Sequence, residues 1–264
     1  MIADKLVSGI HDYLKKTGFT QAHLGLSGGI DSALVAYLAA KAAGKDNTVC
    51  IYMPSRFSSK DSGEHAAKMA SRLGCRFETL SIESVFIAFL TTLEGIFKGK
   101  PFDIAEENIQ SRIRGALLMA YSNKFNSMLL SCANKSELAM GYCTLYGDTV
   151  GSLLPIGDLY KTEVYVLCNK INEQEKKEGN AEIFPQALME KPPSAELRPN
   201  QKDEDSLPPY NVLDTILKLY INEELSAEEI VSRGIDRKLT EHVIKTVTWA
   251  EFKRRQMPPM IPHP

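Results

Sequence analysis

Eight consecutive residues combine three glycines, two serines and one carboxylate in the segment Gly25-Leu26-Ser27-Gly28-Gly29-Ile30-Asp31-Ser32. A short apolar run, 22–24, precedes this segment, and a helical pattern over 33–43 follows it. Glycines in a turn between a strand and a helix let the backbone approach an anion, and the free N–H groups there point at it. Because the hydroxyl groups of Ser27 and Ser32 add two donors, the segment predicts a phosphate-binding loop.

Asp31 is the unusual member of this loop, because a carboxylate repels a phosphate unless a cation lies between them. The loop therefore implies Mg²⁺, which takes oxygen ligands. It is neither a Walker loop, which requires Gly-x4-Gly-Lys-Ser/Thr, nor a dinucleotide fingerprint with Gly-x-Gly-x-x-Gly after the strand. A plain glycine turn is the alternative, but such a turn needs neither the serines nor the aspartate.

A second carboxylate, Glu137, follows another apolar run, 127–132, in the sequence Asn134-Lys135-Ser136-Glu137. In a doubly wound sheet, ligands bind outside the carboxyl ends of the strands, so Glu137 should lie on the same rim as Asp31. Two carboxylates at one phosphate site can share Mg²⁺. The alternative is that Glu137 only complements the dipole of a helix start.

Apolar periodicity predicts the elements that position these residues. Strands and helices alternate from the first strand to the third, which is typical of a parallel sheet. The fold class predicted is α/β, with a doubly wound parallel sheet flanked by helices. The expected strands are 22–24, 48–53, 76–82 and 127–132, and the expected helices are 2–16, 33–43, 60–73, 83–97, 103–125, 136–142 and 159–171.

The composition changes at about residue 174, where a charged run, 173–179, reads as a solvated helix end. Ten of the 13 prolines lie from Pro185 onward, and the polar stretch 185–209 is expected to be a long loop. Loops of this length in compact domains are usually functional lids or disordered. A C-terminal helical segment, 210–256, should follow, with helices at 211–220, 226–234 and 239–254. The whole chain, 1–264, is expected to be a single domain.

Composition and charge exclude several classes of protein. The chain has 264 residues, of which 44% are hydrophobic and 24% are charged, with a net charge of −2 that argues against a nucleic-acid binder. No apolar run approaches the roughly 20 residues that a membrane span needs. The five cysteines are scattered without a Cys-x-x-Cys pair, which indicates reduced thiols in a cytoplasmic protein and no metal ligation.

The Ser-Gly-Gly-x-Asp-Ser loop resembles that of the ATP pyrophosphatase superfamily, which has the adenine nucleotide alpha hydrolase-like fold. Three further segments resemble NAD synthetases in order and spacing, and this resemblance covers about residues 1–260. They are Asn134–Glu137 with Gly141–Asp148, Pro193–Leu197 and Lys253–Pro258. The amino-acid sequence of 192–210 is most similar to that of the synthetase domain of glutamine-dependent enzymes.

The resemblance implies a ligase that uses ATP and Mg²⁺ to amidate deamido-NAD to NAD. ATP first adenylates the nicotinate carboxylate and releases pyrophosphate, and ammonia then displaces AMP. The family is a homodimer with the deamido-NAD site at the subunit interface, for which the helices within 83–125 are candidates. Because the glutamine-dependent relatives carry an N-terminal glutaminase domain and this sequence starts at the synthetase, we expect free ammonia or a separate glutaminase chain as the nitrogen source.

Site residues follow from the resemblance position by position. The loop 25–32 is expected to hold ATP and pyrophosphate. Asp31 and Glu137 are expected to bind Mg²⁺, and Asp31 with Lys161 forms the catalytic pair. Lys161 neutralises the ATP phosphates and Ser194 lies near ATP, whereas deamido-NAD is assigned to Arg112 and Lys253. The alternative for Lys161 is a surface lysine of a helix. Arg114 is two residues from Arg112 and points elsewhere, so only one of the two needs to be functional.

Several positions depart from the family pattern. Cys132 replaces a threonine that contacts ATP, and Leu145 and Ser152 replace a lysine and an aspartate that contact deamido-NAD in ammonia-dependent relatives. Tyr146 and Asp148 are candidate substitutes. The serine-rich stretch 55–62 is either a loop that closes over the phosphates or an ordinary surface loop.

Other functions stay open at this point. One is a different ATP pyrophosphatase that acts on another carboxylate or carbonyl acceptor. A second is a nucleotide-binding module without catalysis, although such a module would not need both Asp31 and Glu137. A third is DNA binding by the short helices within 225–253, which the acidic residues 223–224 and 228–229 oppose.

Overall fold

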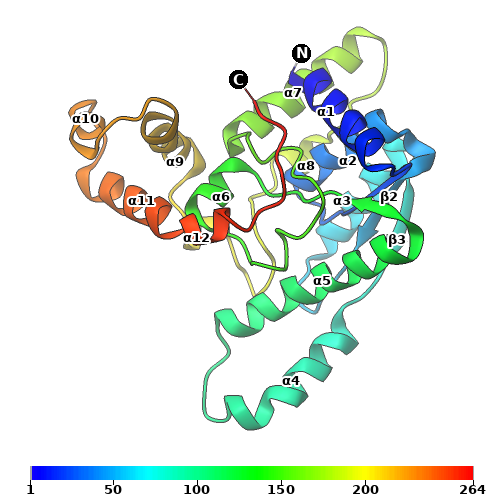
Figure 1. Ribbon diagram of the computed structural model, residues 1–264, viewed down its shortest axis with the longest axis horizontal. Helices are drawn as coiled ribbons and strands as arrows, with labels where there is room; N and C mark the ends of the chain where they lie inside the picture. Colours follow the sequence, from blue (N-terminus) through cyan, green and yellow to red (C-terminus); the bar gives the residue numbers. More distant parts are fainter. Residues whose placement is uncertain (1, 264) are drawn as a thin grey trace.

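Four short parallel strands form the centre of the protein in a computed structural model that describes residues 2–263 (Figure 1). Their order across the sheet is β3-β2-β1-β4, and each neighbouring pair is parallel. The strands are β1 (Gln21–Gly25), β2 (Thr48–Tyr52), β3 (Arg76–Thr79) and β4 (Ser127–Leu129). The predicted doubly wound parallel sheet is confirmed, and the carboxyl end of β1 leads directly into the serine-glycine loop.

Helices cover both faces of this sheet. One core joins alternate strand residues such as Ala22 and Leu24 to α1 (Ile2–Thr17), α2 (Ile30–Ala43), α3 (Lys60–Leu73) and α7 (Lys161–Lys177). The second core joins Val49 and Leu129 to α4 (Glu83–Phe97) and α5 (Ile104–Phe125). Since successive residues of a strand point to opposite faces, both faces of a nearly all-apolar strand can be buried.

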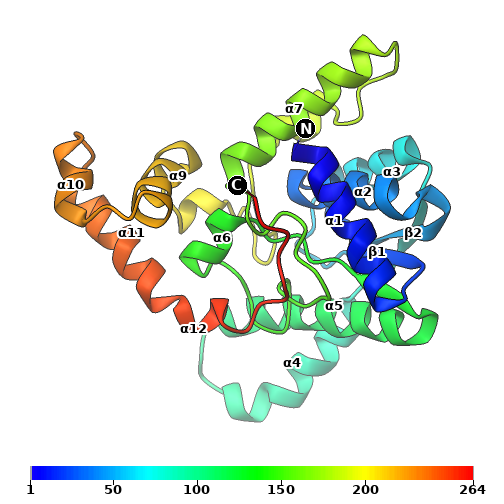
Figure 2. The same ribbon diagram turned by 45° about the horizontal axis from the view of Figure 1, so that its top comes forward.

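The C-terminal helices form a third cluster beside the carboxyl edge of the sheet (Figure 2). They pack on α6 (Lys135–Met140), which carries Glu137. The cluster comprises α9 (Tyr210–Leu217), a π-helical turn (Lys218–Asn222), α10 (Ala227–Ser232), α11 (Arg237–Trp249) and α12 (Glu251–Arg254). This arrangement brings the end of the chain close to the site formed by its first half.

Several predicted boundaries were wrong. The third strand ends at Thr79 rather than 82, because Ile82 is already fully buried beneath Phe86 at the start of α4. The helix predicted over 159–171 is α7, which continues to Lys177 because its Glu, Gln and Lys residues favour helix, so it ends inside the charged run 173–179 as that run predicts. The loop 185–209 contains a short helix, α8 (Gln186–Met189), and a 3-10 turn, Asp203–Asp205.

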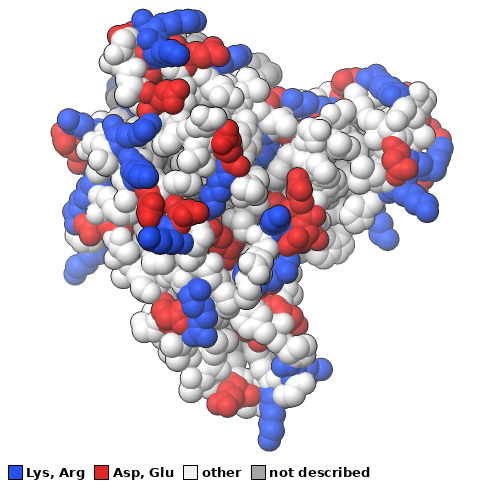
Figure 3. Space-filling view, turned by 180° about the vertical axis from the view of Figure 1, so that it is seen from behind, with Lys and Arg blue, Asp and Glu red and all other residues white. Residues whose placement is uncertain are grey.

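The surface carries both signs of charge, and Lys and Arg side chains alternate with Asp and Glu over the face shown in Figure 3. None of the helices within 2–263 has both the length and the apolar character that crossing a bilayer requires. All five cysteines are free thiols.

His23 in the centre of β1 predicts acid sensitivity. Its Nε2 lies 3.0 Å from the Leu118 carbonyl oxygen and its Nδ1 lies 2.9 Å from Ser127 Oγ. Burial lowers the pKa of His23 from 6.5 to about 4. At a pH between these two values, the unfolded chain binds a proton at His23 and the folded protein does not. The free energy of unfolding should therefore decrease as the pH is lowered through this range, by up to about 3 kcal/mol.

Urea unfolding of the wild type and of His23→Gln at neutral and mildly acidic pH measures this effect. We expect the variant to be less stable at neutral pH but to lose less stability on acidification, because its side chain does not titrate. Parallel pH dependences in the two proteins would show that His23 is not the group responsible.

Candidate active site

The serine-glycine loop has the geometry of an anion-binding turn. Ser32 Oγ accepts a hydrogen bond from the Ser27 amide at 3.1 Å and donates to the Gly29 carbonyl oxygen at 3.0 Å. Gly29 is the N-cap of α2 and supplies no side chain to the first amides of that helix. Because the first N–H groups of a helix have no acceptor within it, they remain available to a phosphate.

Gly28 fixes how closely this loop approaches the next helix. Its φ is +84°, and a Cβ built there would lie 2.2 Å from the Ser62 carbonyl oxygen at the start of α3. A side chain would therefore require both an unfavourable backbone conformation and a shift of backbone atoms.

The Gly28→Ala variant is thus expected to weaken ATP binding at least about tenfold, because the loop and α3 must separate. Gly95→Ala is the matched control, since no atom lies within 4 Å of a Cβ at this helical position. Calorimetric titration with ATP measures both variants. Unchanged affinity in Gly28→Ala would contradict the tight approach of the loop to α3.

Lys161 lies between the two predicted magnesium ligands. Its Nζ forms an ion pair with Asp31 Oδ2 and lies 3.6 Å from Glu137 Oε1. The side chain of Lys161 is only 3% exposed, so the alternative of a surface lysine is wrong. The charges of Asp31 and Glu137 raise the pKa of Lys161 although burial alone would lower it.

Two side chains outside this triad hold it in place. Asn134 Nδ2 donates to Asp31 Oδ1 at 3.1 Å, while Asn134 Oδ1 accepts from the Glu137 amide at 3.0 Å. Asp214 accepts from Ser136 Oγ at 2.5 Å and from the Thr162 amide at 2.8 Å, beside Lys161 at the first turn of α7. The relative positions of α2, α6, α7 and α9 are therefore fixed by buried polar contacts.

A third carboxylate, Asp203, adds negative charge to the site. Asp203, from the proline-rich stretch, is 4% exposed and accepts from Tyr210 Oη at 2.8 Å. Burial raises the pKa of Asp203, and burial together with the charge of Asp31 raises that of Glu137 to about 8. Asp31 and Glu137 thus share one ammonium group with a third carboxylate close by on the cavity wall, an arrangement that favours an additional cation.

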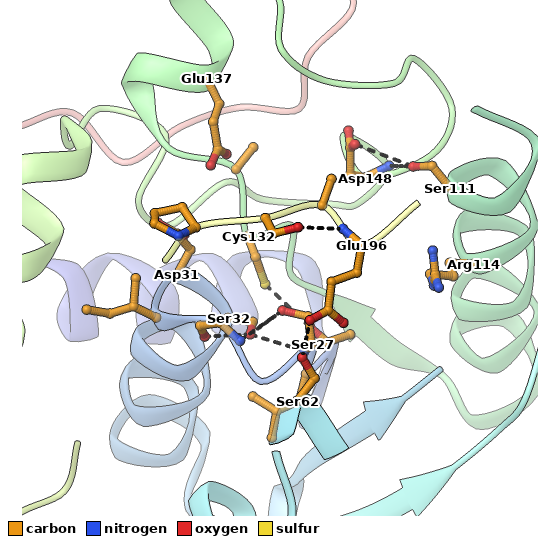
Figure 4. A pocket seen from close by; sticks show the side chains of 18 of the residues that line it. Ser27, Asp31, Ser32, Ser62, Ser111, Arg114, Cys132, Glu137, Asp148 and Glu196 are labelled. Carbon is orange, nitrogen blue, oxygen red and sulfur yellow. Dashed lines mark hydrogen bonds between the residues drawn. The ribbon is translucent and has the colours of Figure 1, made fainter. Parts of the chain in front are cut away.

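These groups line a cavity of about 300 Å³ at the carboxyl edge of the sheet (Figure 4). Of the predicted site residues, the loop apart from Gly28 lines it, together with Glu137, Lys161 and Ser194. The Ser194 hydroxyl donates to the Gln201 carbonyl oxygen at 2.6 Å and accepts from the Glu196 amide at 3.1 Å. Ser58 and Ser62 of the serine-rich stretch also lie on the cavity wall.

Arg112 and Lys253 do not line this cavity, but both contact the segment 141–148. Arg112 Nε donates to the Leu145 carbonyl oxygen at 3.3 Å, and Lys253 Nζ donates to the Gly141 and Cys143 carbonyl oxygens at 2.7 Å each. These two predicted residues therefore meet at one segment, outside the wall formed by the phosphate loop.

Arg114, rather than Arg112, lies in the cavity. Its Nε donates to the Met53 carbonyl oxygen at 2.9 Å, and it forms no ion pair with any residue of the described range 2–263. Burial lowers the pKa of Arg114 to about 10. In Figure 4 it lies on the side of the cavity away from Asp31 and Glu137.

Some of the positions that depart from the family pattern line the cavity and others do not. Cys132 lines the cavity, and its Sγ is 3.9 Å from the Gly25 carbonyl oxygen, whereas Leu145 and Ser152 do not reach the lining. Asp148 lies on the wall, and burial raises its pKa to about 6. Tyr146 is 66% exposed.

Comparison with known proteins agrees with this geometry. A family model described as NAD synthase matches residues 2–258. A glutamine-dependent NAD(+) synthetase from Rhodobacter capsulatus is 49% identical over 254 residues, which are 94% of this chain and 46% of the relative. A protein of the same name from Thermotoga maritima is 49% identical over 251 residues, which are 95% of this chain and 43% of that relative. The chain spans less than half the length of these curated relatives.

Solved structures of about the same length are also similar. An NH3-dependent NAD synthetase from Campylobacter jejuni shares 29% identity and a TM-score of 0.75, with 97% of this chain and 96% of that chain covered. An NMN synthetase from Francisella tularensis shares 26% identity and a TM-score of 0.77, with 96% and 94% covered. The family match over nearly the whole sequence, together with these relatives, shows that the chain belongs to the NAD synthase family.

Proposed function

We propose that this protein catalyses the ATP- and Mg²⁺-dependent amidation of deamido-NAD to NAD, with ammonia as the nitrogen donor. The observation that carries the proposal is the convergence of the phosphate loop, Asp31, Glu137 and Lys161 on one cavity in a member of this family. The enzyme would be an AMP-forming ligase.

The chemistry fits the groups that the cavity offers. A carboxylate is a poor electrophile, so an oxygen of the nicotinate carboxylate first attacks the α-phosphorus of ATP, and pyrophosphate leaves. Ammonia then attacks the carbonyl carbon of the acyl-adenylate, and AMP leaves with one carboxylate oxygen. The loop amides and Lys161 Nζ would hold the phosphates and the departing pyrophosphate, so positioning and charge neutralisation supply the rate gain.

Mg²⁺ fits the carboxylates of this site. Asp31 and Glu137 approach the same ammonium group, and Glu137 has a raised pKa that an added cation would lower. Within 2–263 no group of three or more His, Cys, Asp or Glu side chains forms a complete metal cage. Phosphate oxygens would therefore complete the coordination, as is usual for Mg²⁺, and the ion would neutralise phosphate charge.

The substrates are assigned to two neighbouring regions. ATP would occupy the cavity, with its phosphates at 25–32 and Ser194 on the facing wall. Deamido-NAD would lie against 141–148, where Arg112 and Lys253 provide positive charge.

A homodimer would cover the apolar surface around α4. Ile87, Phe89, Ile96 and Ile104 are between 47% and 80% exposed, and α4 extends away from the sheet (Figure 1). Exposed apolar patches of this kind mark interaction surfaces, and two-fold dimers are the commonest oligomers. A second copy would bury these side chains and complete the acceptor site.

Phe89→Glu is therefore expected to convert a dimer into a monomer in sedimentation experiments and to lower amidation activity. Ala88→Glu, on the exposed side of α4 opposite the buried Phe86, carries the same charge and should leave the dimer intact. A wild-type protein that sediments as a monomer would contradict the assignment of this surface.

We further propose that residues 1–264 act as one NAD synthetase domain, because the C-terminal cluster packs on α6 and supplies Tyr210 to the site.

The free thiols are consistent with a cytoplasmic location, where glutathione keeps cysteines reduced.

NAD formation from deamido-NAD, ATP and Mg²⁺, with ammonium or glutamine supplied in parallel, tests the proposed function. We expect equal amounts of NAD and AMP with ammonium and no product with glutamine alone. Product from glutamine after a glutaminase is added should match the ammonium result, because the glutaminase releases free ammonia. Because one structural neighbour is an NMN synthetase, nicotinate mononucleotide is the competing acceptor. A preference for it would overturn the deamido-NAD assignment.

A further inference from the structure

One carboxylate ties the proline-rich stretch to the serine-rich stretch. Glu196 Oε1 accepts from Ser59 Oγ at 2.8 Å, Ser62 Oγ at 2.7 Å and Lys191 Nζ at 3.0 Å, and Glu196 Oε2 accepts from the Ser59 amide at 3.1 Å. The two serines belong to the start of α3 and lie more than 130 positions from Glu196 in sequence. This cluster is hereafter called the Glu196 clamp.

The clamp lies directly beside the phosphate loop. Ser62 is 1% exposed, and its carbonyl oxygen is the atom that a side chain at Gly28 would meet. Ser62, Lys191 and Glu196 all line the nucleotide cavity, and Figure 4 shows Glu196 reaching down to Ser62 next to Ser27. The segment that Glu196 holds is therefore one wall of the ATP site.

The clamp also accounts for an unusual backbone conformation. Glu196 has a φ of +50°, in the left-handed region that non-glycine residues seldom adopt without compensating contacts. Its amide donates to Ser194 Oγ at 3.1 Å, so the position of Glu196 sets that of Ser194. Although burial would raise the pKa of Glu196, hydrogen bonds from Ser62, Lys191 and Ser59 lower it, which keeps the carboxylate charged.

We propose that Glu196 is a positioning residue that holds residues 191–198 closed over the nucleotide, with Ser194 facing the phosphate loop. The proposal rests on the proposed function, since it assumes that ATP occupies this cavity. Glu196 touches no reacting atom, and its effect passes through Ser194, Lys191 and the start of α3.

Glu196→Gln tests the clamp, because an amide removes the charge and, with its oxygen kept toward the hydroxyl and ammonium donors, points its NH2 group at the Ser59 amide donor. We expect the KM for ATP to rise about tenfold while kcat at saturating ATP changes less than about threefold. Hydrogen exchange in 191–198 should accelerate in the variant. Glu190→Gln is the matched control, since Glu190 is exposed and accepts from Gln186 Nε2, which lies outside the clamp.

A double-mutant cycle with Ser62→Ala identifies the partner. If both residues act through one contact, the double variant should bind ATP no more weakly than Glu196→Gln alone. Titration with ATP and Mg²⁺ in the absence of acceptor gives this affinity independently of NAD formation. A wild-type protein that binds ATP but makes no NAD would refute the proposed function. The ATP affinity and the hydrogen exchange of 191–198 in the variants would still test the clamp.

The clamp is overturned by either of two results. In one, Glu196→Gln matches Glu190→Gln in ATP affinity and in hydrogen exchange. In the other, Glu196→Gln lowers the melting temperature and reduces kcat while the KM for ATP stays unchanged. That result would indicate that Glu196 has a structural role alone.

Discussion

Replacing Asp31 by Asn is expected to stop the release of pyrophosphate from ATP, by a factor of about 100 or more, and to leave the fold intact. Asp31 is the one loop side chain that pairs with Lys161 and lies beside Glu137 at the phosphate site. The amide fills the same volume, and Asn134 can still bond to its oxygen, but the charge that would hold Mg²⁺ is lost.

Pyrophosphate measured with a coupled assay, together with circular dichroism, separates chemistry from folding. Asp46→Asn is the control, because Asp46 is exposed in the turn after α2 and does not line the cavity. Full activity of Asp31→Asn would show that the metal assignment is wrong.

Lys161→Met should have the second large effect, on both activity and stability. Removing the ammonium deprives the phosphates of their nearest protein cation and leaves buried carboxylates unpaired. We expect a loss of activity of about 100- to 1000-fold. The free energy of unfolding should fall by about 3 kcal/mol, which is typical when one partner of a buried ion pair is removed.

The stability of Lys161→Met should also depend on pH. Without the ammonium, the pKa of Glu137 in the folded protein lies still further above its unfolded value than in the wild type. The folded variant then holds a proton that the unfolded chain releases, so its stability should decrease as the pH rises through that raised pKa. Urea unfolding across this range checks the direction, with Lys170→Met on the exposed side of α7 as the control. Equal losses in the two variants would contradict the buried pair.

The sequence was sufficient to bring Asp31 and Glu137 together, although 106 positions separate them. Both follow a strand of one parallel sheet, and the carboxyl ends of such strands share an edge. The same reasoning could not place Asp203 or Glu196. They belong to a proline-rich stretch without periodicity, whose path depends on individual contacts such as the one between Glu196 and Ser62.

Helix geometry explains why Arg112 and Arg114 lie in different places. Residues two apart on a helix point to nearly opposite sides, so the sequence indicated that only one of the two needs to be functional, and Arg112 was assigned to deamido-NAD. The sequence could not show which of them faces the cavity, because α5 packs on the sheet and also borders 141–148. The structure places Arg114 in the cavity and Arg112 against Leu145, and the role of Arg112 in binding deamido-NAD stays a prediction.

The fate of the carboxylate oxygens of deamido-NAD tests the central claim most directly. With both oxygens labelled as ¹⁸O, and with ATP, Mg²⁺ and ammonium present, an acyl-adenylate pathway transfers one labelled oxygen to AMP and keeps the other in the amide of NAD. Mass spectrometry of the AMP should therefore show one ¹⁸O per molecule. Unlabelled AMP, or label in orthophosphate formed together with ADP, would contradict adenylation in this cavity.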